Sequence, residues 1–247
     1  MRHIHKPAIV PAAIRDYLEN QTLVGHGLDY RTFSQTASPQ GGSRGGQLCR
    51  ELTAEQFGLC AYTGAGIDNR LGNVVDPNEQ LKFRSHNEHL KPQSVCRQEL
   101  MENGRQPGVD VGDDMNHLNI VAALEVSGDA TKVARKDLFG ATHRQNAPVS
   151  ILPTDPRCEE EFQFDAQGNV SALTDDGRDT IAQLNLNHGT LIGWRAQAIA
   201  TFVEFIQSRA DAKNVIDRTS NPTNGILPEY AFAIRSVVQS MLEISEA

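Results

Sequence analysis

Ser85-His86-Asn87-Glu88-His89-Leu90-Lys91-Pro92-Gln93-Ser94, residues 85–94, sets a carboxylate directly beside an imidazole in a polar, turn-prone segment. A carboxylate is a hard oxygen ligand suited to Mg²⁺ or Mn²⁺, and a neutral imidazole can take a proton from water near pH 7. Glu88 and His89 are therefore candidates for a metal ligand and a general base. A lone Glu-His dipeptide is more often a solvated surface pair, so its context decides between the two interpretations.

Composition places the chain among proteins with a sizeable core, because 247 residues suffice for one large domain or two small ones. No apolar run of about 18 residues and no secretory signal pattern occurs, so we expect a cytoplasmic protein without a membrane span. The cysteines lie far apart, which predicts free thiols rather than a disulfide framework. They are Cys49, Cys60, Cys96 and Cys158.

The formal net charge of -8 argues against strong, unaided binding to a polyanion. Basic residues form only local clusters, which lie at the start of the chain, on either side of residues 85–94, and between Lys132 and Arg144. Such clusters can hold one phosphate, but tight duplex binding requires more. We therefore expect a partner to supply grip or targeting.

Residue spacing predicts helices in the first half of the chain and a loop rich in Gly and Ser at residues 34–46. The helices are expected over residues 11–20, from a cap at Thr53 onward, and over residues 94–103. Residues 106–114 read as a Gly/Asp-rich loop, and residues 129–138 as a basic helix or an insertion. No Gly-Lys-Ser/Thr follows the glycines of residues 34–46, so a phosphate loop is excluded there.

The second half changes character beyond Pro148. Alternating residues with a Gln-Gly-Asn turn predict a β-hairpin over residues 162–173, and helical spacing begins near Asp179. Longer helices are expected over residues 190–209 and 228–244, with Trp194 in the core. We therefore divide the chain into residues 1–50, 51–150 and 151–247: an N-terminal helix and loop, a core with the residue 85–94 motif, and a hairpin followed by helices.

Several segments together resemble the HNH, or ββα-metal, nucleases found in Septu anti-phage systems and beside some retrons. In order along the chain they are Leu59-Cys60-Ala61-Tyr62, residues 86–94, Asn119-Ile120-Val121, residues 151–159, Phe162-Gln163-Phe164-Asp165 and Leu184-Asn185-Leu186-Asn187. The resemblance runs from the first residues to about Phe205 and is strongest between Pro153 and Asp165. It implies an α+β fold, with an HNH ββα-metal core surrounded by helices and followed by a C-terminal helical region.

The resemblance also implies site roles. Glu88 matches a metal ligand and His89 the general base, while Asn119, with Asn116 as the alternative, matches the residue that ties down the loop before the helix. Asn146 matches the final metal ligand, and His143 competes for that role; on a helix the two would share a face. One Mg²⁺ or Mn²⁺ ion per active site is implied.

Three further residues are candidates for supporting roles. His86 lies two residues from Glu88 along an expected strand, so it shares that face and can act behind the metal ligand. Lys91 or Arg144 can steady a phosphate. Relatives often carry a zinc knuckle, but Thr63 stands where the second cysteine would be, so we expect no structural zinc. Apolar packing must then hold the core, through Leu59, Tyr62, Phe83, Leu90, Leu118, Ile120, Val121 and Leu124.

Function follows as an expectation from this resemblance: a metal-dependent endonuclease that hydrolyses DNA as the effector of an anti-phage complex with a larger ATPase subunit. Two alternatives stay open. The chain can be a ribonuclease that cuts tRNA or another structured RNA in a retron-like system, or an adaptor whose HNH core has lost catalysis. The retained Glu88, His89, Asn119 and Asn146 argue against the last.

Overall fold

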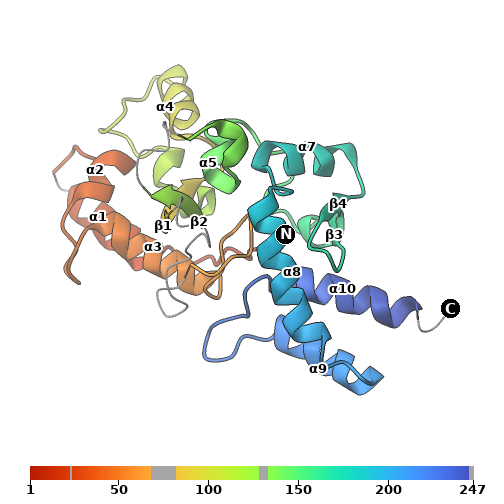
Figure 1. Ribbon diagram of the computed structural model, residues 1–247. Coiled ribbons are helices and arrows are strands. Elements are labelled where there is room, and N and C mark those ends of the chain that lie inside the picture. Colours follow the sequence, from red (N-terminus) through yellow and green to blue (C-terminus); the bar gives the residue numbers. More distant parts are fainter. Residues whose placement is uncertain (23, 68–81, 128–132, 245–247) are drawn as a thin grey trace. The chain divides into compact units, whose positions relative to one another are not determined.

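The computed structural model describes residues 1–22, 24–67, 82–127 and 133–244, and it is a mixed α+β structure (Figure 1). Its residues divide into two compact units. Unit 1 comprises Met1–Ile4, Gln56–Ser85 and Ala123–Ala247, and unit 2 comprises His5–Glu55 and His86–Ala122. The α+β class expected from the sequence is confirmed. The unit boundaries do not coincide with the expected divisions after residues 50 and 150.

Unit 2 contains four α-helices and two short 3-10 helices in its described part. They are α1 Ala12–Thr22, α2 Tyr30–Gln35, α3 Arg44–Glu55, α4 Gln93–Glu102, η2 Asp113–Met115 and η3 His117–Asn119. Tyr17 of α1 and Phe33 of α2 meet edge to face with ring centroids 5.2 Å apart, and both are buried. Leu48 and Leu52 of α3 are fully buried as well, so apolar faces of these helices form the core of the unit.

Residues 85–89 of the motif lie on a strand. β1 Lys82–His89 pairs with β2 Ile120–Ser127 in a two-stranded sheet, and the division into units passes through both strands. Residues 120–123 of β2 have exposures of 0%, so this strand is buried on both faces. The strand β1 ends at His89, and Pro92 begins the turn into α4. This turn places the Glu-His pair at a strand end.

Unit 1 holds the remaining elements. They are η5 Arg135–Asp137, α5 Gly140–Arg144, α6 Cys158–Glu161, β3 Phe162–Phe164, β4 Val170–Ala172, α7 Asp175–Leu184, α8 Gly189–Val203, α9 Arg209–Ser220 and α10 Ala231–Ile244. The strands β3 and β4 pair antiparallel with Gln163 opposite Ser171, which confirms the predicted hairpin. Trp194 is half-buried and meets Phe83 and Phe139 edge to face, at centroid distances of 5.6 and 5.8 Å.

Helices expected near residues 11–20, 94–103 and 228–244 are confirmed as α1, α4 and α10. The helix start at Thr53 is wrong, because Thr53 is buried inside α3. That helix begins at Arg44, within the expected loop, and Ser43 Oγ accepts the Gly46 amide at 3.1 Å. A serine cap thus outweighs the two neighbouring glycines.

The helix predicted over residues 190–209 is confirmed as α8, but it ends earlier, at Val203, and a separate helix, α9, begins at Arg209. Ser208 Oγ accepts the Asp211 amide at 3.2 Å, and the Asp211 carboxylate accepts the Gln207 amide at 3.2 Å, so this pair caps a new helix, α9. Leu118, expected in the core, is 49% exposed. The predicted helix over residues 129–138 falls partly outside the described residues, and the part that is described contains only the short η5.

All four cysteines are free, as predicted. Cys60 Sγ accepts the Leu124 backbone amide at 3.2 Å, and Thr63 Oγ1 accepts the Ala65 amide at 3.3 Å. Both side chains therefore accept backbone amides, Thr63 within its own turn and Cys60 from β2. No helix in the ranges that the structure describes has the length and apolar character needed to cross a bilayer.

Candidate active site

His89 is held at the end of β1 by contacts on three sides. Its Nε2 lies 2.9 Å from the carbonyl oxygen of Asp114, and the side-chain amide of Gln93 lies 3.2 Å from its Nδ1. The Tyr30 ring meets the imidazole edge to face at 4.4 Å. A carbonyl oxygen only accepts hydrogen bonds, so Nε2 carries the proton and Nδ1 presents its lone pair.

Burial lowers the pKa of His89 below its ordinary value, because desolvation penalises the imidazolium. The hydrogen bond to the Asp114 carbonyl and the nearby Asp114 and Glu88 carboxylates raise the pKa in opposition, without overcoming burial. Only 5% of His89 is exposed. The ring is therefore neutral near pH 7, which is the protonation state that a general base requires.

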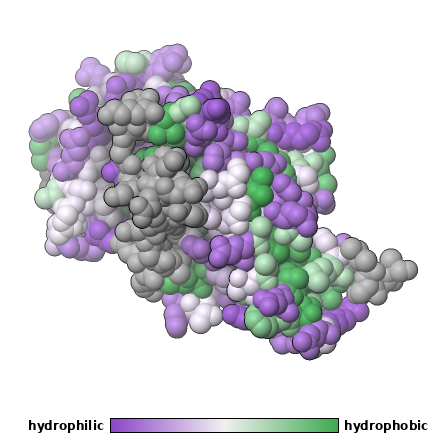
Figure 2. Space-filling model, in the orientation of Figure 1, coloured by the Kyte–Doolittle hydropathy of each residue, from purple (hydrophilic) through white to green (hydrophobic). Residues whose placement is uncertain are grey.

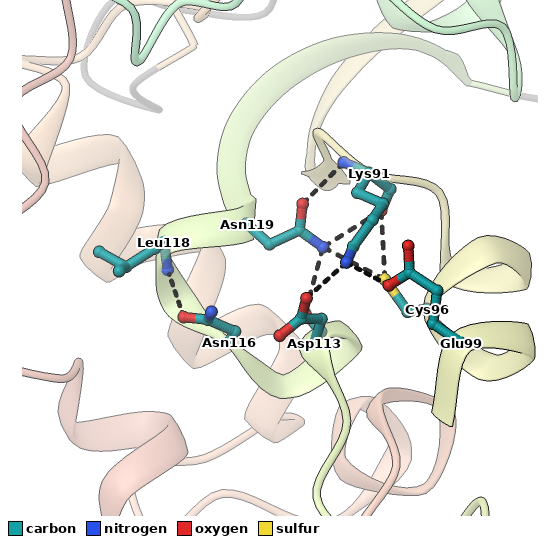
Figure 3. Close-up of polar contacts among 7 residues, drawn as sticks. All are labelled: Lys91, Cys96, Glu99, Asp113, Asn116, Leu118 and Asn119. Atoms are coloured by element: carbon teal, nitrogen blue, oxygen red, sulfur yellow. Dashed lines mark hydrogen bonds and ion pairs between the residues drawn. The ribbon is translucent and has the colours of Figure 1, made fainter. Parts of the chain in front are cut away.

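Asn119 ties the turn after His89 to the start of β2 (Figure 3). Its Oδ1 accepts the Lys91 amide at 2.7 Å, and its Nδ2 donates to the carbonyl oxygens of Lys91 and Asp113, both at 3.1 Å. The Asn119 carbonyl also accepts the Leu90 amide at 2.9 Å. This side chain thus uses both its acceptor and its donor on backbone groups next to His89.

Asn116, the alternative for that role, makes a more local contact. Its Oδ1 accepts the amide of Leu118 at 3.1 Å and caps the short helix η3 (Figure 3). Its side chain also hydrogen-bonds to the Asp113 carboxylate, three residues before it. The geometry therefore favours Asn119 over Asn116 as the residue that fixes this turn.

Lys91 is engaged by two carboxylates. Its Nζ lies 2.5 Å from Glu99 Oε2 and 2.5 Å from Asp113 Oδ2 (Figure 3). These hydrogen bonds raise the pKa of Lys91 above its ordinary value, and the Lys91 ammonium lowers the pKa of Asp113. Two negative charges already offset the ammonium, so Lys91 is poorly disposed to hold a phosphate as well.

Glu88 and His86 face the same side of β1, as two residues at i and i+2 of a strand must. Glu88 Oε2 lies 3.1 Å from His86 Nε2, and the two side chains are 14% and 19% exposed. A carboxylate accepts hydrogen bonds, so His86 Nε2 carries a proton and donates it to Glu88. His86 therefore orients the Glu88 carboxylate, as a residue behind a metal ligand does.

His143 and Asn146 belong to unit 1, whereas Glu88 and His89 belong to unit 2. His143 lies in α5, where its Nδ1 is 2.9 Å from the Gln183 carbonyl oxygen and therefore donates to it. Asn146 is exposed and follows the helix, because Gln145 has a φ of 55° and ends it. The expectation that the two share one helical face is wrong, and their role as metal ligands stays a prediction.

Arg144 is buried in unit 1, with 1% exposure. Its Nη1 donates to the Tyr62 hydroxyl and its Nε to the Ala147 carbonyl at 2.8 Å. The guanidinium therefore stabilises the segment after α5 and does not lie at the surface, where a phosphate would meet it. Nothing in the sequence distinguished this arginine from its exposed neighbours.

Sequence reasoning missed four residues around His89: Tyr30, Gln93, Asp113 and Asp114. Asp114 contacts both His89 and the aromatic residue that packs on it. Its carbonyl oxygen accepts a hydrogen bond from His89, and its Oδ2 accepts the Tyr30 amide at 2.9 Å. Both aspartates lie in a segment that reads as a Gly/Asp-rich loop, and that composition was the one available signal. Among the described residues no cluster of three or more His, Cys, Asp or Glu side chains suited to a metal occurs.

Comparison with known proteins found no protein-family model that matches this chain and no curated protein that matches it in sequence.

Proposed function

We propose that this protein is a metal-dependent endonuclease of the HNH type that hydrolyses phosphodiester bonds of DNA. The observation that carries the proposal is the state of His89: a neutral imidazole with Nε2–H committed to a carbonyl oxygen and Nδ1 acting as an acceptor. Glu88 precedes it directly, and Asn119 fixes the turn that follows it. A base beside a carboxylate at a rigid strand end is what the reaction requires.

In the proposed reaction His89 Nδ1 takes a proton from water as the water oxygen forms a bond to phosphorus. The bond from phosphorus to the leaving oxygen breaks, and that oxygen acquires a proton from solvent. The Asp114 carbonyl keeps Nε2 protonated and becomes a stronger partner for the ring as positive charge develops. Water must replace the Gln93 amide at Nδ1, and Gln93 is exposed, so its side chain has room to turn away.

A divalent cation is part of this proposal. Glu88 would supply a carboxylate oxygen, and the hydrogen bond from His86 Nε2 would orient that carboxylate. When bound, Mg²⁺ or Mn²⁺ would offset negative charge on the scissile phosphate and the leaving oxygen. His143 and Asn146 remain proposed as metal ligands.

Nucleic-acid binding by the chain alone should be weak. The net charge is -8, and basic residues beside the motif are already paired: Lys91 with Glu99 and Asp113, and Arg84 with Glu125 at 2.7 Å. Lys6, in the N-terminal basic cluster, pairs with Glu55 at 2.8 Å and is nearly buried. We therefore propose that a larger ATPase subunit controls access to DNA in an anti-phage complex.

The proposed docking surface for that ATPase is the apolar face of α8 and α9 in unit 1. Figure 2 shows apolar side chains gathered over α8. Phe202, Phe205 and Val215 line a hollow there, and Phe205 is 71% exposed. Large exposed apolar side chains that adjoin a hollow are typical of protein interfaces.

The decisive experiment compares plasmid DNA with purified tRNA as substrates, with Mn²⁺ or with a chelator, and with or without the ATPase. We expect Mn²⁺-dependent cleavage of DNA that the ATPase stimulates. Cleavage of tRNA alone would overturn the choice of DNA in favour of a ribonuclease. Absence of cleavage in every arm would favour the adaptor.

A further inference from the structure

Arg44 is a buried cation without a counterion. It is 7% exposed, and its Nε and Nη1 are fully enclosed with no hydrogen-bond partner. In the part of the chain that the structure describes, no carboxylate forms an ion pair with it. A guanidinium whose donors are removed from water and left unpaired destabilises a fold. Arg44 therefore calls for an explanation other than stability.

The position of Arg44 adds to this cost. It is the first residue of α3, a helix of 12 residues, and the positive end of a helix dipole disfavours a cation. The Asp29 carboxylate caps α2, and on α3 itself Glu51 accepts the Ala13 amide at 3.1 Å and Glu55 pairs with Lys6. The start of α3 thus combines two sources of positive potential, and these three carboxylates are engaged with other groups.

The N-terminus of α3 is also hydrogen-bonded to β1, the strand that carries Glu88 and His89. Asn87, between His86 and Glu88 on β1, donates from Nδ2 to the Gly45 carbonyl at 2.8 Å. Its Oδ1 is also enclosed without a hydrogen-bond partner. The residue after Arg44 is therefore hydrogen-bonded to the strand that carries Glu88 and His89.

We propose that Arg44 binds a phosphate group of the substrate and holds the nucleic-acid backbone against β1. A phosphate suits the site because a guanidinium donates two parallel hydrogen bonds to its oxygens, and a helix N-terminus favours negative charge. Arg44 keeps 7% of its surface exposed, and Nη2 is not among the enclosed atoms without a partner, so we expect the anion to approach from Nη2.

A small movement of the preceding turn would admit the anion further. Ser38 and Gly42 pair through their backbones at 2.9 Å, and Gly41 and Gly42 are exposed with φ of 89° and 71°. A Cβ at either glycine would meet nothing within 4 Å, so this turn is not wedged against other atoms. The Gly/Ser-rich segment lacks a phosphate-loop pattern. It would instead contribute to phosphate binding through the single side chain of Arg44.

The identity of the anion as nucleic-acid phosphate rests on the proposed function, whereas the unpaired charge does not. The test uses Arg44→Met and Arg44→Lys, with Arg50→Met as the matched control, since Arg50 is an exposed arginine of the same helix. Melting temperatures are measured with a chelator present, so that cleavage cannot intervene. Inorganic phosphate and a short single-stranded DNA are each compared with chloride at constant ionic strength.

We expect the wild type and Arg50→Met to gain melting temperature with both ligands, and the DNA to act at a concentration at least tenfold lower. Arg44→Met should lose that gain, yet melt without ligand at or above the wild-type temperature, because an unpaired buried charge is gone. Arg44→Lys should retain part of the gain, since a lysine keeps the charge without the fork.

Three results would overturn the proposal. An undiminished phosphate gain in Arg44→Met would place the anion elsewhere, and a fall in its ligand-free melting temperature, or failure to fold, would make Arg44 a structural residue. A response to inorganic phosphate without any response to DNA would remove the nucleic acid from the proposal. Nuclease activity can be present in each of these cases, so failure here is separable from failure of the proposed function.

Discussion

Replacing Asn119 by alanine should loosen the turn that follows His89. The substitution removes the acceptor of the Lys91 amide and the donor to the Lys91 and Asp113 carbonyls. Three backbone groups lose a partner at once, and each such hydrogen bond contributes about 0.5 to 1.5 kcal/mol. We expect the free energy of unfolding to fall by about 2 to 4 kcal/mol.

Two further substitutions sharpen the test. Asn119→Asp keeps an oxygen for the Lys91 amide but turns a second oxygen toward two carbonyl oxygens, so it should destabilise at least as much as Asn119→Ala. Asn116→Ala loses the hydrogen bond to the Leu118 amide and should cost about 1 kcal/mol. Urea unfolding measures all three differences.

Amide hydrogen exchange gives a control inside the same molecule. In Asn119→Ala the Lys91 amide, bonded to the missing side chain, should lose protection. The Leu90 amide, bonded to the backbone carbonyl of residue 119, should keep most of its protection. An unfolding free energy within about 1 kcal/mol of the wild type, or equal protection of both amides, would refute the role assigned to Asn119.

Three other predictions concern pH, zinc and assembly. Folding lowers the pKa of His89, so below about pH 6.5 the unfolded state binds more protons than the folded state. The free energy of unfolding should therefore fall as the pH drops from 7 toward 5. The same slope of unfolding free energy against pH in His89→Gln would contradict this. Purified protein should contain no stoichiometric zinc and should melt at the same temperature with a chelator, since Thr63 stands where a thiolate would be needed. Phe205→Glu, at a side chain 71% exposed, should weaken ATPase binding at least tenfold and leave the melting temperature within a few degrees, whereas unchanged binding would move the docking surface elsewhere.

Local sequence patterns predicted much of the secondary structure. The hairpin at Phe162–Phe164 and Val170–Ala172 follows from alternation around a turn, and α1, α4 and α10 follow from apolar spacing. Helix ends were predicted less well. A single side chain, Ser43, begins α3 in a glycine-rich stretch, and the helix expected over residues 190–209 ends at Val203, ahead of the Ser208 cap of α9.

The sequence predicted which residues belong to the candidate site, but it did not predict which groups those residues contact. Glu88, His89 and Asn119 stand out from their chemistry and from the HNH resemblance, whereas the Asp114 carbonyl that orients His89 is a backbone group that no side-chain pattern announces. Charge was misleading in the same way. Lys91 and Arg144 read as phosphate contacts, yet one is paired with two carboxylates and the other is buried against Tyr62.

The central claim is that His89 is the base and Glu88 a ligand, and a paired measurement of cleavage rate and Mn²⁺ affinity tests it most directly. His89→Gln can keep the hydrogen bond to the Asp114 carbonyl, so it should fold and bind Mn²⁺ like the wild type while cleaving DNA roughly 100-fold to 10,000-fold more slowly. Glu88→Gln should instead weaken Mn²⁺ affinity, with a rate defect that shrinks as Mn²⁺ is raised. Cleavage by His89→Gln within about tenfold of the wild type, or an unchanged Mn²⁺ affinity in Glu88→Gln, would contradict the account.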